Sequence, residues 1–270
     1  MNRMFLVRLA CLTVTSAILC AGCGQSPTGP TPVVPAVTVG VVPQTATPLP
    51  PRDSINPPRA LGVTRFVAFG DSITWGAQSA FDPRFIFADL NGGYPDRLHA
   101  ALNTYHTPQA FTVFNEGDPG ELAVNAVARF RTMLINRRPQ AVLLLEGIND
   151  LNNGVSVSRT AGALQQMIDA ATAAGVPVVI ATMFQTYETT DPNGVIRGNG
   201  ADLVPAFNTE IRRVASGRLN VYLLDLEVLM RDRRLVGNDG LHLTDAGFEV
   251  MATAFLSAIE AAFPVRGSFQ

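Results

Sequence analysis

The feature that most constrains this chain is a series of short apolar runs that alternate with amphipathic segments. Each run has the length of a strand and is too short for an ordinary helix. The runs occupy residues 65–69, 111–114, 141–145, 176–181 and 221–226. Strands that are apolar on both faces and separated by helices form a parallel sheet. The sequence therefore predicts an α/β domain built on five mostly parallel strands.

The clearest helix follows the last strand. Thr244 is placed to cap its N-terminus, and Pro264 follows its end. Apolar side chains recur on one face at helical spacing, which predicts a core-facing stripe and not a cofactor site. They are Phe248, Met251, Ala252, Phe255, Leu256 and Ile259. Further helices are expected near residues 94–104, 121–135 and 159–174.

Composition excludes several kinds of chemistry. The chain contains no lysine, so Schiff-base lysines, Ser-Lys dyads and a P-loop lysine are all absent. A net charge of -2 without an arginine-rich run gives no electrostatic basis for binding nucleic acid. The only cysteines are Cys11, Cys20 and Cys23, so the rest of the chain has no thiol nucleophile, thiolate metal site or internal disulfide. No metal cluster or nucleotide loop is evident, and we expect no cofactor.

The first 23 residues read as an export signal. Arg3 and Arg8 precede an apolar run over residues 9–19, and two small residues stand just before Cys23. The run is too short for an ordinary membrane span, and the segment resembles a bacterial lipobox, in which the cysteine carries the lipid. Cys20 stands where such boxes usually have leucine, so simple cleavage without lipid is the alternative. We expect an exported envelope protein, anchored through Cys23 or otherwise periplasmic or extracellular.

Residues 24–60 are dense in Pro, Thr and Val and show no helical or strand period. Such composition predicts a disordered, extended tether. The expected organisation is therefore a signal over 1–23, a tether over 24–60 and one catalytic domain over 61–270.

Polar motifs follow the predicted strands, where ligands bind in an open parallel sheet. Ser72 comes directly after the first strand, and His242 and Asp239 precede the final helix. A serine hydroxyl needs an adjacent base to become a nucleophile, and an Asp-x-x-His pair can supply an oriented imidazole. His99 and His106 are expected to be ordinary surface or packing residues.

Stabilising the oxyanion of an acyl-transfer reaction requires fixed hydrogen-bond donors. The backbone N–H of Ser72, the N–H of Gly120 before a predicted helix and the side-chain amide of Asn149 are the candidates. Each of these residues has a simpler explanation as a helix cap, a turn or a loop support. A serine, two further donors and an Asp-His pair at successive strand ends nevertheless indicate catalysis.

Four blocks of the sequence resemble those of the SGNH (GDSL-like) hydrolases. They are Gly70-Asp71-Ser72-Ile73-Thr74, Gly120 five residues after Asn115, Gly147-Ile148-Asn149-Asp150 and Asp239-Gly240-Leu241-His242. The resemblance spans roughly residues 63–262. It implies a flavodoxin-like three-layer α/β/α sandwich with Ser72 as nucleophile, His242 as base and Asp239 as its partner. It also places Ser72, Gly120 and Asn149 in the oxyanion hole; Pro119, directly before Gly120, has no N–H and supplies no donor.

The resemblance implies a serine esterase acting through an acyl-enzyme on short-acyl or carbohydrate O-acetyl esters. The alternatives are a non-catalytic binding module for envelope glycans and a peptidase. Specificity is expected in the long connections 75–93 and 184–200, the first of which carries Trp75, Phe81, Phe85 and Phe87. Glu146 at the end of the third strand fits either a bond to loop amides or a partly exposed strand end. Nothing in the sequence bears on oligomeric state.

Overall fold

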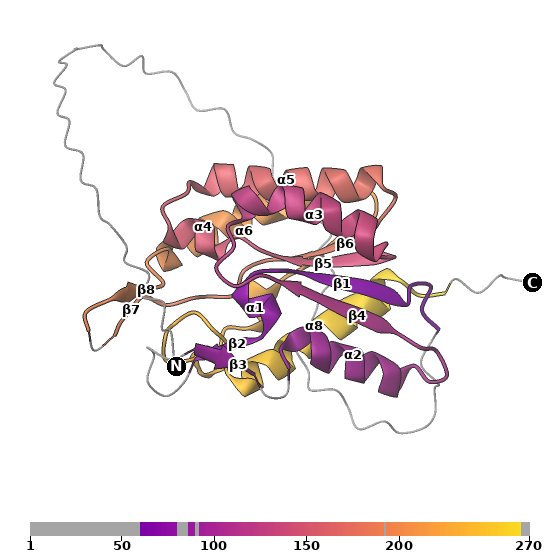
Figure 1. Ribbon diagram of the computed structural model, residues 1–270, viewed down its shortest axis with the longest axis horizontal. Coiled ribbons are helices and arrows are strands. Elements are labelled where there is room, and N and C mark those ends of the chain that lie inside the picture. Colours follow the sequence, from indigo (N-terminus) through magenta and orange to yellow (C-terminus); the bar gives the residue numbers. More distant parts are fainter. Residues whose placement is uncertain (1–59, 80–85, 90–91, 192, 266–270) are drawn as a thin grey trace, which may run out of the picture. The chain divides into compact units, whose positions relative to one another are not determined.

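The structure, a computed structural model, describes residues 60–79, 86–89, 92–191 and 193–265 (Figure 1). The predicted export signal, Cys23 and all but the last residue of the tether lie outside the described residues, as do Phe81 and Phe85. The described residues therefore belong, apart from residue 60, to the domain that was expected over residues 61–270.

A five-stranded parallel sheet forms the centre of this domain. In spatial order its strands are β4 (Thr112–Gly117), β1 (Arg65–Gly70), β5 (Ala141–Leu145), β6 (Val178–Ala181) and β9 (Val221–Leu224). Every neighbouring pair is parallel. The predicted α/β fold with five parallel strands is confirmed.

Helices cover both faces of the sheet, which gives the three layers that were expected (Figure 1). One face carries α3 (Ala123–Arg137), α5 (Val157–Ala173) and α6 (Val204–Ala215). The other carries α2 (Tyr94–Tyr105) and α8 (Asp245–Ala262). The Thr244 hydroxyl accepts a hydrogen bond from the Gly247 N–H and caps α8, as its sequence predicts. Within the described residues, no helix has both the length and the apolar character to cross a membrane.

Short elements connect these layers. The helical turns are α1 (Ser72–Trp75), α4 (Ile148–Asn152), α7 (Leu226–Leu229), η1 (Ala201–Leu203) and η2 (Arg233–Leu235). The two long connections singled out in the sequence each form a small antiparallel hairpin. The first pairs β2 (Ala77–Ser79) with β3 (Ile86–Ala88), and the second pairs β7 (Thr189–Thr190) with β8 (Ile196–Arg197).

Two element boundaries differ from the prediction for physical reasons. Strand β4 continues to Gly117, past the end of its apolar run, because its backbone stays paired with β1 although its side chains are only half-buried. Helix α3 begins at Ala123 and not at residue 121. The carboxylate of Asp150 accepts the N–H groups of Ala123 and Val124, at 2.6 and 3.2 Å, and so sets the first turn there.

Packing of α3 on the sheet depends on Phe130, which is fully buried and meets Phe69 of β1 edge to face at a centroid distance of 5.0 Å. We predict that Phe130→Ala lowers the free energy of unfolding by about 3–5 kcal/mol, because it removes a buried ring and leaves a cavity. Urea unfolding measures the loss. Ile135→Ala on the same helix is the control, since Ile135 is 73% exposed and its truncation should change stability by less than about 0.5 kcal/mol. Equal losses for the two variants would contradict the packing described.

Candidate active site

The carboxyl end of β1 places Ser72 at the carboxyl edge of the sheet, between the ends of β4 and β5. Strand β1 pairs with both β4 and β5, so Gly70, Gly117 and Leu145 end in register. A Cβ on Gly70 would lie 2.2 Å from the Leu145 carbonyl oxygen, and one on Gly117 would lie 2.1 Å from the Trp75 backbone nitrogen. Glycine at both positions therefore allows the strand ends and α1 to close around Ser72.

Three of the predicted site residues, Ser72, His242 and Asp239, meet in a line of hydrogen bonds. The Ser72 Oγ lies 2.9 Å from His242 Nε2, and His242 Nδ1 lies 2.6 Å from Asp239 Oδ2. All three side chains are buried, with residue exposures of 7, 5 and 1%. With Asp239 ionised, Nδ1 carries the proton and Nε2 is free to accept one from the serine hydroxyl.

A tight turn before α8 holds Asp239 against the histidine. Its Oδ1 accepts the backbone N–H groups of Leu241 and His242, at 3.1 and 3.0 Å. Burial alone would raise the pKa of Asp239, but the hydrogen bond and charge of His242, with these two N–H groups, hold it below its usual value. Asp239 is therefore an ionised carboxylate that orients the imidazole over the neutral pH range.

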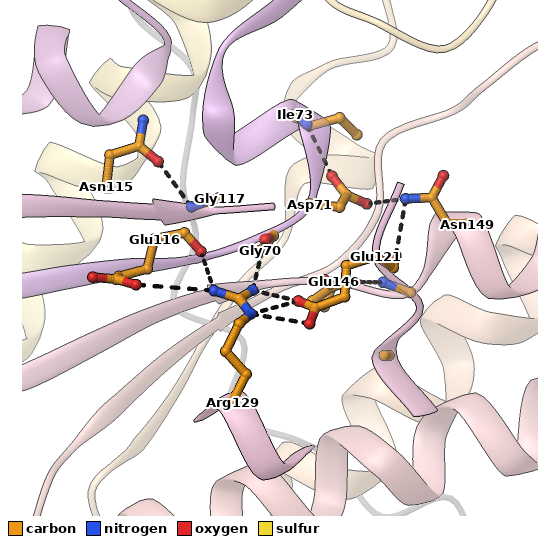
Figure 2. Close-up of polar contacts among 12 residues, drawn as sticks. Gly70, Asp71, Ile73, Asn115, Glu116, Gly117, Glu121, Arg129, Glu146 and Asn149 are labelled. Atoms are coloured by element: carbon orange, nitrogen blue, oxygen red, sulfur yellow. Dashed lines mark hydrogen bonds and ion pairs between the residues drawn. The ribbon is translucent and has the colours of Figure 1, made fainter. Parts of the chain in front are cut away.

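The two other expected oxyanion donors lie at neighbouring strand ends. Asn149 is in α4, directly after β5, and its side-chain amide donates to the Glu121 carbonyl at 3.0 Å and to Asp71 Oδ2 at 3.3 Å (Figure 2). Gly120 lies three residues before α3, in an exposed turn with a φ of 82°, and a Cβ there would meet no atom within 4 Å. The turn leaves the backbone at Gly120 open to an approaching ligand.

A group of carboxyl side chains lies beneath the site and was not predicted as a unit. We call Asp71, Glu121, Glu146 and Asp150 the acidic cluster; Asp71, Glu146 and Asp150 are buried. Figure 2 shows Asp71, Glu121 and Glu146. Burial, opposed in part by the Ile73 N–H and His242, raises the pKa of Asp71 to about 6, with Asp150 and Glu121 adding to the rise. Burial raises the pKa of Glu146 well above its usual value, with contributions from Asp71, Glu121 and Asp150. The sequence left Glu146 open; the structure places it as a buried acid whose Oε2 accepts the Gly147 N–H at 2.8 Å.

Arg129 of α3 neutralises one edge of the acidic cluster. Its Nε lies 2.9 and 3.0 Å from the two carboxylate oxygens of Glu121, and its remaining nitrogens donate to the carbonyls of Glu116 and Gly70 (Figure 2). The guanidinium also stacks on the Phe69 ring, 3.9 Å from its centroid. Arg129 thus ties α3 to the ends of β1 and β4. No sequence pattern singled it out, because its partners come from three separate segments, which are β1, β4 and the turn before α3.

The two other histidines lie apart from the hydrogen bonds of the site. His106 ends α2 and bonds Glu260 at 2.9 Å, and His99 accepts the Val113 N–H; neither contacts Ser72 or His242 through a hydrogen bond. In the described part of the chain, no group of three or more His, Cys, Asp or Glu side chains is arranged to hold a metal ion. Trp75 and Phe87 are 41 and 43% exposed.

A model of the "GDSL-like Lipase/Acylhydrolase family" matches residues 68–250, and no curated protein matches the chain. Solved structures share the fold. A family 3 carbohydrate esterase from Clostridium thermocellum is 19% identical, with a TM-score of 0.56, over 72% of this chain and 94% of that one. An acetylxylan esterase from Geobacillus stearothermophilus is 19% identical, with a TM-score of 0.59, over 75% of this chain and 96% of that one. A lipase/acylhydrolase from Enterococcus faecalis is 19% identical, with a TM-score of 0.58, over 76% of this chain and 100% of that one.

Burial of Glu146 predicts a stability that depends on pH. Because its folded-state pKa is raised well above the usual 4.5, the folded chain keeps this proton while the unfolded chain releases it. Stability from this group is complete below about pH 4.5 and is lost as the pH rises toward the folded-state pKa. Glu146→Gln mimics the protonated acid. As the pH rises through that window, the free energy of unfolding of the variant should therefore increase relative to that of wild type, by up to about 1.4 kcal/mol per pH unit.

Urea unfolding of both proteins at several pH values between 4.5 and 8 measures this difference. Glu210→Gln is the control, because Glu210 lies on the surface of α6, paired with Arg213. A difference between wild type and Glu146→Gln that stays constant with pH would contradict the assignment of Glu146 as a protonated acid.

Proposed function

Because the chain belongs to the GDSL-like lipase/acylhydrolase family, we propose that it is a serine esterase with Ser72 as nucleophile, His242 as base and Asp239 as the orienting carboxylate. The single observation that carries this proposal is the 2.9 Å contact between Ser72 Oγ and His242 Nε2, with Asp239 on the opposite ring nitrogen. An imidazole held in this way can remove the serine proton as the hydroxyl attacks a carbonyl.

The proposed reaction has two acyl-transfer steps. Ser72 Oγ attacks the ester carbonyl and passes its proton to His242, and the imidazolium then returns that proton to the departing alcohol. The acyl group remains on Ser72 as an ester. Water, deprotonated by His242, attacks this acyl-enzyme, and the acid leaves as Ser72 regains its proton. No cofactor takes part in these steps.

Charge that develops on the carbonyl oxygen needs donors at the carboxyl edge of the sheet. We assign this role to the Ser72 and Gly120 backbone N–H groups and to the Asn149 amide. The Asn149 amide is already held by the Glu121 carbonyl at 3.0 Å and, more weakly, by Asp71 at 3.3 Å. In the proposed reaction the oxyanion replaces Asp71 as the second acceptor of the Asn149 amide, so Asn149 needs little reorganisation to stabilise it.

The substrates we propose are short-acyl esters and O-acetyl esters of carbohydrates. Two of the similar structures are described as a carbohydrate esterase and an acetylxylan esterase, which supports this class. The second candidate function is an envelope glycan-binding module, which the exposed aromatic side chains of Trp75 and Phe87 favour, since aromatic faces stack on sugars.

The first experiment measures hydrolysis of p-nitrophenyl acetate and longer acyl homologues by the wild type and by Ser72→Ala. We expect kcat/KM of the variant to fall by at least about a thousandfold, because the nucleophile is removed while binding contacts remain. Ser257→Ala on the exposed face of α8 is the matched control and should retain full activity. A fluorophosphonate probe should label wild type but not Ser72→Ala.

Equal turnover by wild type and Ser72→Ala would contradict the assignment of the nucleophile. Inactivity of both across the series, with no labelling of Ser72, would favour the glycan-binding module. Cleavage of amide analogues at a rate comparable to that of esters would point instead to a peptidase.

We further propose that the protein is exported and anchored to the envelope through a lipid on Cys23, with residues 24–60 as its tether. The arrangement of arginines, apolar run and small residues before Cys23 supports this. Expressed in a bacterial host with labelled palmitate, the wild type should carry the label and sediment with membranes, whereas Cys23→Ser should do neither. Cys20→Ser, three residues away, is the control and should behave as wild type. Labelling that survives Cys23→Ser would contradict the proposed anchor.

A further inference from the structure

A cavity of about 170 Å³ lies directly beside His242. Its walls come from the end of α4, from β8 with the residues after it, and from the loop that carries the histidine. The residues that matter here are Asn152, Arg197, Asn199, Leu241 and His242. Cavities for drug-sized ligands usually measure about 300–1,000 Å³, so this one has room for one ring or substituent of a larger substrate.

Hydrogen bonds connect the walls of this cavity and hold its shape. Thr189 of β7 pairs with Arg197 in the hairpin, and its hydroxyl donates to the Asp239 carbonyl at 2.9 Å. The Tyr187 N–H donates to the Gly240 carbonyl at 2.8 Å. Asn199 donates to the Asn152 carbonyl at 2.9 Å. The hairpin is therefore fixed both to the loop of His242 and to the end of α4, at the same edge of the domain as α1 (Figure 1).

Arg197 is the one charged wall residue whose side chain has no polar partner among the described residues. Its Nε is buried and makes no hydrogen bond. By contrast, Arg129 and Arg212 are held by carboxylates, at 2.9 and 2.6 to 2.9 Å. A buried donor without an acceptor is unfavourable, and a guanidinium presents a planar fork that matches a carboxylate. The geometry of Arg197 thus suits an anionic acceptor that arrives with a ligand.

The position of the cavity indicates which part of an ester it receives. In the proposed reaction His242 gives its proton to the departing alcohol, so the alcohol must lie beside the imidazole. The cavity is lined by His242 but not by Ser72, which bonds the acyl group. It therefore adjoins the alcohol portion of the substrate and not the acyl chain.

We propose that this cavity binds a carboxylate on the alcohol portion of the ester, such as that of a uronic acid sugar, and that Arg197 determines this specificity. The inference rests on the proposed esterase function. Asp239 also borders the cavity, but its oxygens are occupied by His242 Nδ1 and by the N–H groups of Leu241 and His242. Its charge is thereby compensated, and Arg197 remains the group that an incoming anion meets.

The test compares phenyl acetate with 3-carboxyphenyl acetate, whose leaving phenols have similar acidity. Wild type should show a kcat/KM about tenfold or more higher for the anionic ester, and this preference should shrink as salt is added. Arg197→Gln should lose about 10- to 100-fold in kcat/KM on the anionic ester while phenyl acetate changes by less than about threefold, in line with the loss of a charge-assisted hydrogen bond. Arg197→Lys keeps the charge but not the planar fork of the guanidinium. Its kcat/KM on the anionic ester should lie between those of wild type and Arg197→Gln.

Arg218→Gln is the matched control, because Arg218 pairs with Asp169 at 2.6 Å and does not line this cavity. It should keep the preference of wild type. Equal kcat/KM values of wild type for the two esters, or an equal loss on both in Arg197→Gln, would overturn the inference and leave the esterase proposal standing.

If wild type hydrolyses neither ester, the proposed function fails, and direct binding decides the inference about the cavity. Calorimetry then compares methyl glucosiduronate with methyl glucoside on the whole chain. Tighter binding of the anionic sugar that disappears in Arg197→Gln supports the anion site, and no difference between the two sugars overturns it.

Discussion

The close approach of three strand ends is the constraint on which the rest of the site depends. Because β1 lies between β4 and β5 in parallel register, Gly70 and Gly117 bring backbone to within distances that no Cβ would tolerate. The turn that carries Ser72 can then sit low at the edge of the sheet, where His242 reaches it from the loop before α8. A side chain at either glycine would clash with neighbouring atoms at about 2 Å and would displace the segments that position this turn.

Such compact packing brings acidic side chains together beneath Ser72. Asp71, Glu146 and Asp150 are buried in one cluster with Glu121, yet Arg129 supplies a single positive charge at its edge. Burial raises the pKa values of Asp71, Glu146 and Asp150, and repulsion between the like charges adds to the rise for Asp71 and Glu146. Asp239 differs because the imidazole and two backbone N–H groups compensate its charge. Neighbouring environments therefore hold the pKa of Asp239 below its usual value and raise the pKa values of the buried acids Asp71, Glu146 and Asp150 beneath it.

Local pattern was sufficient to predict the sheet and the residues at its carboxyl edge. Apolar runs of strand length gave the five strands, and their polar ends named Ser72, Asn149, Asp239 and His242, because parallel strands must present their ends at one edge. What the pattern missed depends on contacts between distant segments. Arg129 joins β1, β4 and the turn before α3, and Asp150 moves the start of that helix. Arg197 stands in a hairpin of two-residue strands, too short for any period to reveal.

Burial of the serine, histidine and aspartate also bears on the choice between a catalyst and a binding module. A site that only holds sugar gains from polar groups that remain open to the ligand, whereas Asp239 is 1% exposed and its carboxylate is held by the imidazole and two backbone N–H groups. Burying a carboxylate is unfavourable unless it is paired, and the pairing here sets the tautomer of His242. That tautomer has a use when a proton moves between Ser72 and a leaving group, and none when a glycan simply binds. The energetic arrangement of these three residues is thus the one that acyl transfer requires.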